Sequence, residues 1–279
     1  MIIQNNIPAI NSYRNLGTNQ SALNKNLEKL SSGYKINRAG DNAAGLAISE
    51  SMRSQINGLN QAASNANDAI GLIQTAEGAL TEVHSMLQRM TTLATQAANG
   101  TYNSTARDNI QTEMDELVKE IDRIANNTDF NGIKPLAKGT ANAGDMTFQI
   151  GPSGAETIVV TGADMTTEGI FGATYTQDLK IDGNETTPAN TAIGKIKTAI
   201  DTVSGYRAKL GAAQNRLEHT ISNLNVTSEN ITAAESRIRD TDMADEITSY
   251  TKNNILLQAA QSMLSQANAA PQGVLSLLR

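Results

Sequence analysis

Cysteine and tryptophan are absent from this chain of 279 residues, and phenylalanine occurs only three times. Without cysteine, the chain forms no disulfide, binds no metal through thiolates and has no thiol nucleophile. Aromatic residues make up 3% of the sequence, so the large anchors typical of a compact globular core are scarce. Alanine, asparagine, glutamine, serine and threonine dominate instead, which favours long, thin packing of small side chains.

Charge is missing from both ends of the chain. The first charged side chain is Arg14, and no Asp, Glu, Lys or Arg lies between Asn253 and Leu278. Amides such as Gln258 and Gln261 interrupt the apolar residues there, which argues against a membrane span of about 20 mostly apolar residues. A solvated tail would carry charge. We therefore expect amphipathic ends that bury one stripe against another protein surface, with amides paired in a semi-polar interface.

The overall charge also restricts the partners. A net charge of −6 and a pI near 5.0 argue against nucleic acid, because phosphate binding needs clustered Lys and Arg. The N-terminus has neither a basic segment nor a long apolar segment, so no Sec-type signal is readable. We expect an intracellular protein, or one exported by a route that leaves no cleavable signal.

The five prolines leave two long segments, 9–134 and 189–270, in which extended helices can form. In the second segment, aliphatic residues recur at every seventh position and predict a coiled-coil seam of about six heptads. The seam residues are Ile196, Val203, Leu210, Leu217, Leu224, Ile231 and Ile238, with Ile193, Ile200 and Ile221 at the companion position. Polar residues interrupt the companion stripe at Arg207, Gln214, Ser228 and Glu235.

The first segment predicts the helices that pack against this seam. One helix is expected from Asn42 to about Asn99, roughly 85 Å long at 1.5 Å per residue, with Glu77 at an expected core position. After a turn, Thr105 and Asp108 have a spacing that resembles a capping box, and a shorter helix should fold back. Near the N-terminus, another apolar stripe is expected at Leu16, Leu23, Leu27, Leu30 and Tyr34.

The amino-acid composition changes between about 138 and 190, where Gly and Thr become frequent. The segments MTFQI and TIVVTG flank a turn at Gly151-Pro152-Ser153-Gly154 and predict a β-hairpin. We therefore expect a mainly α protein: a rod of long antiparallel coiled-coil helices with a small β-hairpin insert and paired terminal helices. The expected division is 1–40 and 241–279 for the terminal helices and 41–240 for the rod, with a β-rich variable insert at about 138–190.

Residues with catalytic or metal-binding patterns are scarce. His84 and His219 have no HExxH context, so we expect partly exposed helix positions rather than a metal or catalytic site. The acidic run around Asp240 and Asp242 lacks the spacing of a calcium loop and favours a helix N-terminus or a solvated face. We expect no enzyme activity, no cofactor and no metal.

Four motifs give the sequence a specific resemblance. They are LEKLSSGYKINRAGDNAAGLAIS at 27–49, QTAEGALTEVHSMLQRM at 74–90, ESRIRDTDMADEI at 235–247 and SQANAAPQGVLSLLR at 265–279. All four resemble bacterial flagellin, in the right order and over nearly the whole sequence except about 138–190. The resemblance implies an extracellular, self-assembling subunit of the flagellar filament.

Several partners follow from the same resemblance. The subunit is expected to be exported unfolded by the flagellar type III apparatus, with an export chaperone on the C-terminal segment. It is expected to polymerise into a helical filament under a cap protein and to meet hook-junction proteins. The residues expected in the assembly core are Leu16, Leu23, Leu27, Leu30, Leu256, Leu257, Met263, Leu264, Leu275 and Leu278.

The resemblance also implies host recognition by Toll-like receptor 5. The matching residues are Gln88, Arg89, Leu93, Gln96 and Glu113. Leu93 falls one position off the stripe of Met90 and Ala94, so we expect it half-exposed at the flank of the core. The alternative is a solvated helix face with one half-exposed Leu.

Two other functions compete with a filament subunit. A hook–filament junction protein would share both termini but form short rings or adaptors, and the intact VLSLLR ending together with SSGYKINRAGDNAAG favours flagellin. A flagellin with a metallopeptidase insert would need HExxH between 138 and 190, where the sequence has no His.

Overall fold

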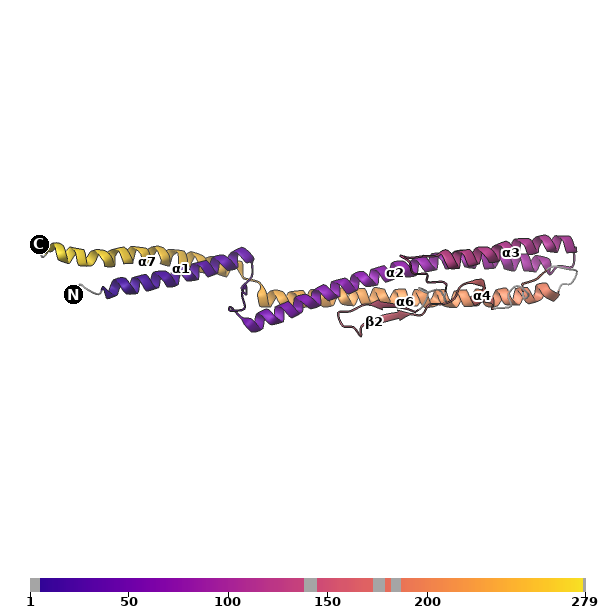
Figure 1. The fold of residues 1–279 in the computed structure, drawn as a ribbon, viewed down its shortest axis with the longest axis horizontal. Helices are drawn as coiled ribbons and strands as arrows, with labels where there is room; N and C mark the ends of the chain where they lie inside the picture. Colours follow the sequence, from indigo (N-terminus) through magenta and orange to yellow (C-terminus); the bar gives the residue numbers. More distant parts are fainter. Residues whose placement is uncertain (1–5, 138–144, 173–178, 182–186, 278–279) are drawn as a thin grey trace. The chain divides into compact units, whose positions relative to one another are not determined.

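A computed structural model describes residues 6–137, 145–172, 179–181 and 187–277, most of which are helical (Figure 1). Contacts divide the protein into two compact units. The terminal unit comprises Met1–Ile56 and Glu229–Arg279, and the central unit comprises Asn57–Ser228. Both divisions fall inside the long helices α2 (Ala43–Ala97) and α6 (Thr187–Arg239), rather than in the loops near 40 and 241.

The terminal unit pairs the two ends of the sequence. Helix α1 (Ile7–Ser32) lies antiparallel to α7 (Met243–Leu277), as Figure 1 shows. Asn6 caps α1 by accepting a hydrogen bond from the Ala9 N–H, and Gly33 ends it with a φ of 76°, a left-handed conformation that favours glycine. Asp242 caps α7 through hydrogen bonds from the N–H groups of Ala244 and Asp245, which confirms the helix N-terminus expected in the acidic run.

The central unit is built on the predicted seam. α2, α6 and a shorter helix, α3 (Ser104–Asn127), lie side by side and enclose one hydrophobic core. The seam residues Ile196, Val203, Leu210, Leu217 and Leu224 are buried, and Ile193, Ile200 and Ile221 are half-buried beside them. The coiled-coil prediction is therefore confirmed in this unit.

Two of the residues that interrupt the apolar stripes, one on α2 and one on α6, meet each other. The guanidinium Nη2 of Arg207 lies 3.4 Å from Oε1 of Glu77, with both side chains partly exposed. Either charge would be costly if it were buried alone in the apolar seam, and the two are instead paired at the solvent-exposed edge of the seam. In the sequence, each residue is an isolated interruption of an apolar stripe, and in the structure the two form an ion pair.

Helix α3 begins earlier than its sequence pattern predicted. Asn103 caps it, because the Asn103 side chain accepts a hydrogen bond from the Ala106 N–H at 2.8 Å. The capping spacing assigned to Thr105 and Asp108 was therefore wrong, since both residues already lie inside the helix. Asn is as good an N-cap as Asp, and it is the first residue after the turn that can act as one.

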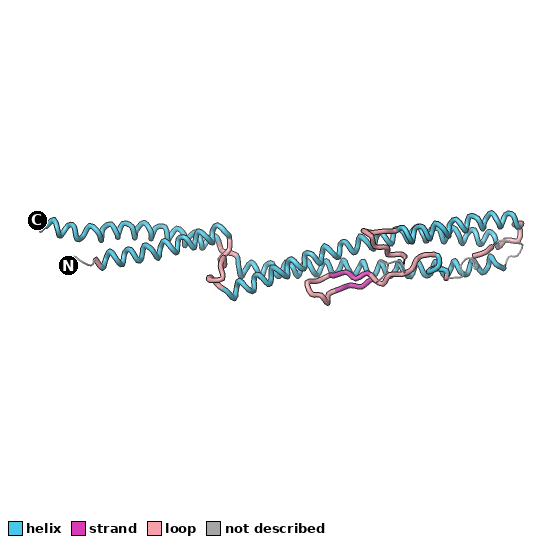
Figure 2. Tube along the Cα trace, viewed as in Figure 1, coloured by secondary structure: helices cyan, strands magenta, loops and turns pink. Residues whose placement is uncertain are grey.

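The insert contains a two-stranded antiparallel hairpin, coloured magenta in Figure 2. Strand β1 (Met146–Gln149) pairs with β2 (Thr157–Val160), with Met146 opposite Val160. The predicted turn lies against α2, where a Cβ on Gly58 would come 2.8 Å from Cβ of Pro152. The hairpin prediction is confirmed.

The expectation of a β-rich insert is too broad. In the described parts of 138–190, the strands are limited to the hairpin, and helix α4 (Thr167–Phe171) and the start of α6 occupy other positions. Residues 138–144, 173–178 and 182–186 of the predicted insert lie outside the described residues. Thr166 caps α4, and Asp122 of α3 accepts hydrogen bonds from the backbone N–H and the hydroxyl of Thr167.

Candidate assembly surface

Large apolar side chains are exposed mainly on the terminal unit. Among the described residues, those on this unit are Ile7, Ile10, Tyr13, Leu27, Ile48, Met243, Ile247, Ile255, Leu256 and Met263, compared with Ile133, Val159 and Val226 on the central unit. Exposed apolar residues are normal when scattered singly, but this group is dense and lies mostly on two adjacent helices. The paired helices α1 and α7 therefore expose the apolar surface that a protein partner would cover.

Burial within the helix pair is slight. In α1 the buried side chains are Leu23 and Asn26, and in α7 no residue of 243–270 is buried. Apolar residues of α7 such as Ile255 and Met263 remain 61% and 64% exposed. A helix with apolar residues all round requires neighbours on several sides. The pairing with α1 supplies only one neighbour.

The predicted assembly residues fall into distinct groups. Leu23 is buried, and Leu16, Leu30, Leu257 and Leu264 are half-buried. Leu27, Leu256 and Met263 are exposed. Leu275 lies in α7 with a side chain that the structure does not describe, and Leu278 lies outside the described residues.

Amides join α1 to α7 within the chain, whereas the amide pairing expected against another protein surface stays a prediction. Asn6 Nδ2 donates to the carbonyl of Ala267 at 2.8 Å, and Asn19 Nδ2 donates to that of Leu256 at 3.4 Å. Near the end of α1 and the start of α7, where charged residues occur again, Lys29 Nζ lies 3.6 Å from Oε2 of Glu246. The specific amides were not predictable, because an asparagine on a helix surface looks the same whether it meets water or a carbonyl.

A short antiparallel contact joins the loop after α1 to the end of α6. Lys35 N–H donates to the Arg239 carbonyl at 2.8 Å, and Thr241 N–H donates to the Gly33 carbonyl at 2.9 Å. The Arg239 guanidinium stacks over the Tyr34 ring at 4.7 Å from its centroid. Assigning Tyr34 to the apolar stripe of α1 was wrong, because Gly33 turns the backbone out of the helix one residue earlier.

Arg239 also binds the start of α2. Its Nη1 lies 2.7 Å from Oε1 of Glu50, and the Arg239 side chain is only 12% exposed. The hydrogen bond from Arg239 lowers the pKa of the Glu50 carboxyl, opposed by some desolvation and assisted by the charge of Arg53. Sequence reasoning missed this cluster. The only signal was a tyrosine directly after a helix-ending glycine.

The residues assigned to receptor binding lie on α2 and α3 of the central unit. Gln88 and Arg89 are exposed, and Arg89 pairs with Glu113 of α3 at 2.7 Å. Gln96 is half-buried and donates to the hydroxyl of Tyr102 at 3.0 Å. These four side chains border one helix pair.

The expected exposure of Leu93 was wrong. Leu93 is only 1% exposed and belongs to the core with Met90, Ala94 and Ala97. Here α2 packs against α3 as well as α6, so two neighbours cover a wider face than the single stripe predicted. Leu93 is consequently not an exposed apolar anchor.

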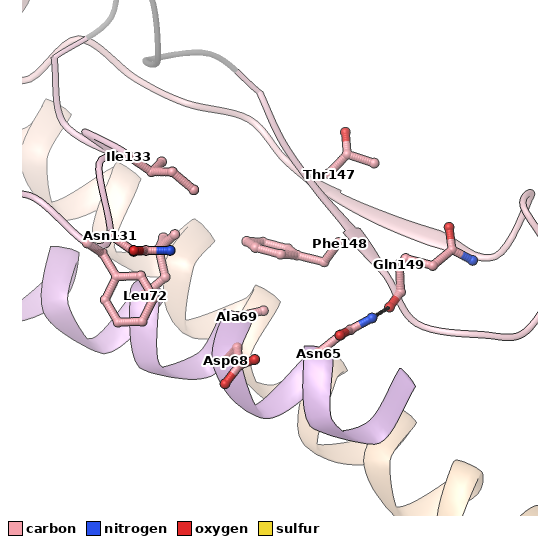
Figure 3. A pocket seen from close by; sticks show the side chains of 10 residues that line it. Asn65, Asp68, Ala69, Leu72, Asn131, Ile133, Thr147, Phe148 and Gln149 are labelled. Carbon is pink, nitrogen blue, oxygen red and sulfur yellow. Dashed lines mark hydrogen bonds between the residues drawn. The ribbon is translucent and has the colours of Figure 1, made fainter. Parts of the chain in front are cut away.

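A small pocket lies beside the hairpin, between α2, the turn at 130–133 and β1 (Figure 3). Phe130 and Phe148 line it together with Asp68, and Asn65 Nδ2 closes one end by donating to the Gln149 carbonyl at 3.2 Å. Among the described residues, no cluster of three His, Asp or Glu side chains is arranged to hold a metal ion. No helix in the described ranges is long and apolar enough to cross a bilayer.

This arrangement defines a class of mainly helical structural protein whose paired ends present apolar surface to partners. The profile of the bacterial flagellin N-terminal helical region matches residues 3–141, and that of the C-terminal helical region matches 193–278. The chain is 50% identical to flagellin of Bacillus subtilis and 50% identical to flagellin of Halalkalibacterium halodurans, with 100% of both sequences covered in each case. The protein therefore belongs to the bacterial flagellin family.

Other relatives agree. The 33 kDa flagellar filament core protein of Treponema phagedenis is 48% identical, again over 100% of both sequences. The crystal structure of Bacillus cereus flagellin aligns with a TM-score of 0.51 and 33% identity, covering 62% of this protein and 94% of that one. A putative hook-associated protein of Vibrio parahaemolyticus aligns with a TM-score of 0.61 at 14% identity, covering 72% and 100%. That last likeness concerns the fold alone.

Proposed function

We propose that this protein is a structural subunit of the bacterial flagellar filament and polymerises through the apolar surface of α1 and α7. Flagellin is a structural protein family, and relatives over the full length are named as flagellins and filament core proteins. The observation that carries the proposed interface is α7, whose residues 243–270 include no buried side chain. Further copies of the protein are the partners that would cover it.

The energetic argument follows from this exposure. Ordering a segment costs about 1–2 kcal/mol per residue in backbone entropy. Fully burying one Leu, Ile or Met side chain contributes about 1.5–3 kcal/mol. Because the helix pair buries so little internally, contacts with several other subunits must supply the stabilisation, and the ends of an isolated monomer should be largely unfolded. Repeated head-to-tail contacts that do not close into a ring then give an open helical polymer.

The resemblance supports further proposals about the life of the subunit. We infer export in an unfolded state through the flagellar type III apparatus, with a chaperone on the uncharged C-terminal segment. Addition at the tip beneath a cap protein, contact with hook-junction proteins at the base and an extracellular location follow from the same reasoning. Ends that are largely unfolded in the monomer suit this route, because a chaperone and a neighbouring subunit would compete for the same apolar residues.

A junction protein is the alternative. It would use the same terminal helices but stop at short rings or adaptors. The likeness to a putative hook-associated protein is limited to the fold, whereas relatives that match over the whole sequence are named as a flagellin or as a flagellar filament core protein. A filament subunit is therefore the function we favour.

A matched pair of substitutions tests the interface. Ile255→Asp should abolish polymerisation of purified protein onto filament seeds, because a carboxylate would be buried between subunits. Val159→Asp is the control, since Val159 is also exposed but lies on the hairpin of the central unit. Electron microscopy and sedimentation measure polymer formation. Filaments of normal length from Ile255→Asp would contradict the assignment of this surface.

A second proposal concerns Toll-like receptor 5. The resemblance assigns the contact to Gln88, Arg89, Gln96 and Glu113, and the exposed ion pair of Arg89 with Glu113 provides a polar contact surface. Arginine is enriched among binding hot spots. The buried Leu93 no longer serves as an anchor, so the proposed contact is mainly polar.

Arg89→Ala should weaken receptor binding by more than about 1 kcal/mol and leave the melting curve intact, as expected for an exposed hot spot. Arg123→Ala is a suitable control, because Arg123 forms a similar exposed pair with Glu120 on α3. Surface plasmon resonance with the receptor ectodomain would measure both affinities. Equal affinity for Arg89→Ala and the parent protein would exclude this site.

A further inference from the structure

The sequence has three Asn-Gly pairs, and the structure places them in three different backbone settings. Asn57-Gly58 lies inside α2, Asn131-Gly132 forms a tight turn, and Asn99-Gly100 lies in the connection between α2 and α3. Asn-Gly is the dipeptide most prone to cyclise, because glycine offers no side chain to hinder attack by its own backbone nitrogen. The same chemistry can therefore be compared within one molecule.

We propose that Asn99 is a site of spontaneous deamidation promoted by the groups around it. The Gly100 nitrogen, as the amidate, attacks Cγ of Asn99 and forms a five-membered succinimide. The bond between Cγ and Nδ2 of Asn99 breaks and releases ammonia, and water then opens the ring at either carbonyl. The balance is one water consumed and one ammonia released, with aspartate or isoaspartate at position 99 as the product.

The nucleophile at Asn99 is both free and stabilised. Asn99 and Gly100 are exposed, and the Gly100 N–H has no hydrogen-bond partner among the described residues. Removing its proton places negative charge on the nitrogen and, by resonance, on the carbonyl oxygen of Asn99. Arg107 Nη2 and the Tyr102 N–H both donate to that oxygen at 3.4 Å. Donors aimed at developing charge lower the barrier to forming it.

The electrophile is polarised as well. Thr101 N–H donates to Oδ1 of Asn99 at 3.3 Å. When Gly100 attacks Cγ, this oxygen acquires the negative charge of the tetrahedral intermediate, and the Thr101 donor is already in place. The guanidinium that favours the amidate is anchored, because Arg107 is 3% exposed and lies in the first turn of α3.

The other two pairs lack this environment. Gly132 N–H donates to Oδ2 of Asp129 at 3.1 Å, so a carboxylate holds the proton that must leave. Asn131 and Gly132 both have positive φ, 52° and 82°, and the backbone bonds between Phe130 and Ile133 fix the turn beside the pocket in Figure 3. Asn57 and Gly58 lie in helical backbone, which keeps the attacking nitrogen in a hydrogen-bonded turn.

The first test needs no mutation. Full-length protein would be incubated at mildly alkaline pH, folded or in urea, and deamidation at each pair would be followed by peptide mass mapping and by enzymatic methylation of isoaspartate. We expect the rate at Asn99, relative to its own rate in urea, to exceed the corresponding ratios at Asn131 and Asn57 by roughly tenfold. An equal or higher ratio at either of those sites would overturn the proposal.

Two variants separate the causes. Arg107→Gln should slow deamidation at Asn99 roughly tenfold in the folded protein. Arg123→Gln, on the same helix but paired with Glu120, is the control and should leave that rate unchanged. A normal Asn99 rate in folded Arg107→Gln would exclude a role for Arg107.

If Arg107→Gln fails to fold, the exposed Asp129 provides an independent test. Asp129→Asn removes the carboxylate that holds the Gly132 proton, so deamidation at Asn131 should rise roughly threefold or more. Asn99 should be unaffected. An unchanged rate at Asn131 would overturn the electrostatic explanation for the difference between the two turns.

Discussion

The central unit buries its seam within one subunit, whereas the terminal unit leaves most of its apolar residues exposed. In the first, residues such as Leu210 and Leu217 are fully buried in one core, to which α2, α3, α6 and the hairpin all contribute. In the second, two helices meet along a line, and their large side chains face outward. Both units use long helices and small residues. The two units differ in how many neighbouring elements cover each helix.

This difference divides folding from assembly. A core that is complete within one subunit allows the central unit to fold before any partner is present. In the assembly proposed above, the incomplete core of the terminal unit would make the ends dependent on other subunits, so that they would become ordered on polymerisation. The uncharged composition of the ends is the counterpart in sequence, because charge would have to be removed from water at every subunit contact.

Removing both ends gives the largest expected effect on this comparison. A protein lacking about 1–35 and 245–279 should remain a folded helical monomer and lose polymerisation completely, since the seam lies in the retained part. Circular dichroism would follow folding, and electron microscopy would follow assembly. Long filaments from the truncated protein would show that the ends are not the interface.

Two substitutions, one at a buried site of the central unit and one at an exposed site of the terminal unit, test the same contrast. Leu217→Asp places an unpaired carboxylate in a fully buried site and should cost several kcal/mol of the monomer's free energy of unfolding. Met263→Asp, at a position 64% exposed, should leave the monomer's melting temperature unchanged and impair only polymerisation. If the two variants lowered the melting temperature equally, the proposed division between folding and assembly would fail.

The Arg239 cluster should have a moderate effect within the terminal unit. Arg239→Ala removes the stacking on Tyr34, worth about 0.5–1 kcal/mol, and should increase proteolysis in the loop after α1. The pKa of Glu50 is lowered in the folded protein, so its ionised carboxylate contributes to folding stability. This contribution is present above the ordinary glutamate pKa of 4.5 and is lost as pH falls through the lowered value. Arg53→Ala is the matched control, since Arg53 meets the same carboxylate at 3.4 Å while half-exposed. Equal proteolysis of the two variants would contradict a special role for Arg239.

The smallest effect concerns Tyr206 in the central unit. Burial raises the pKa of its hydroxyl above the ordinary value of 10.0, because the phenolate is poorly solvated there. As pH rises, the Tyr206 hydroxyl therefore loses its proton in the unfolded state first. The contribution of Tyr206 to the free energy of unfolding is fully present below about pH 10 and declines as pH rises further. Denaturant titrations at increasing pH should show a shallower decline for Tyr206→Phe. Identical slopes would mean that Tyr206 stays accessible to solvent.

Sequence patterns predicted most of the central unit, because its periodicities reflect burial within one subunit. The seven-residue repeat located Ile196 through Leu224, and the Gly151 to Gly154 turn located the hairpin. Periodicity reports which face of a helix is apolar. It does not report how many neighbours share that face, which is why Leu93 was expected at the surface and is buried against a third helix.

The terminal unit was predictable in kind but not in detail. The absence of charge indicated a protein interface, yet the residues exposed on it include Tyr13, Ile247 and Ile255, which the apolar stripes did not single out. Contacts such as Arg239 on Tyr34 join segments far apart in sequence, and neither residue carries a local pattern that announces the other. Long-range pairs of this kind require the fold.

The asparagine bonds between α1 and α7 have a mechanical consequence. Apolar burial is non-directional, and this helix pair buries few side chains, so apolar contacts alone fix its axial register weakly. Asn6 on the carbonyl of Ala267 and Asn19 on that of Leu256 attach the two helices at separate points along their length. Because a shift of one helix along the other would break both of these directional bonds, they help to set the register of the pair and oppose shear along its axis.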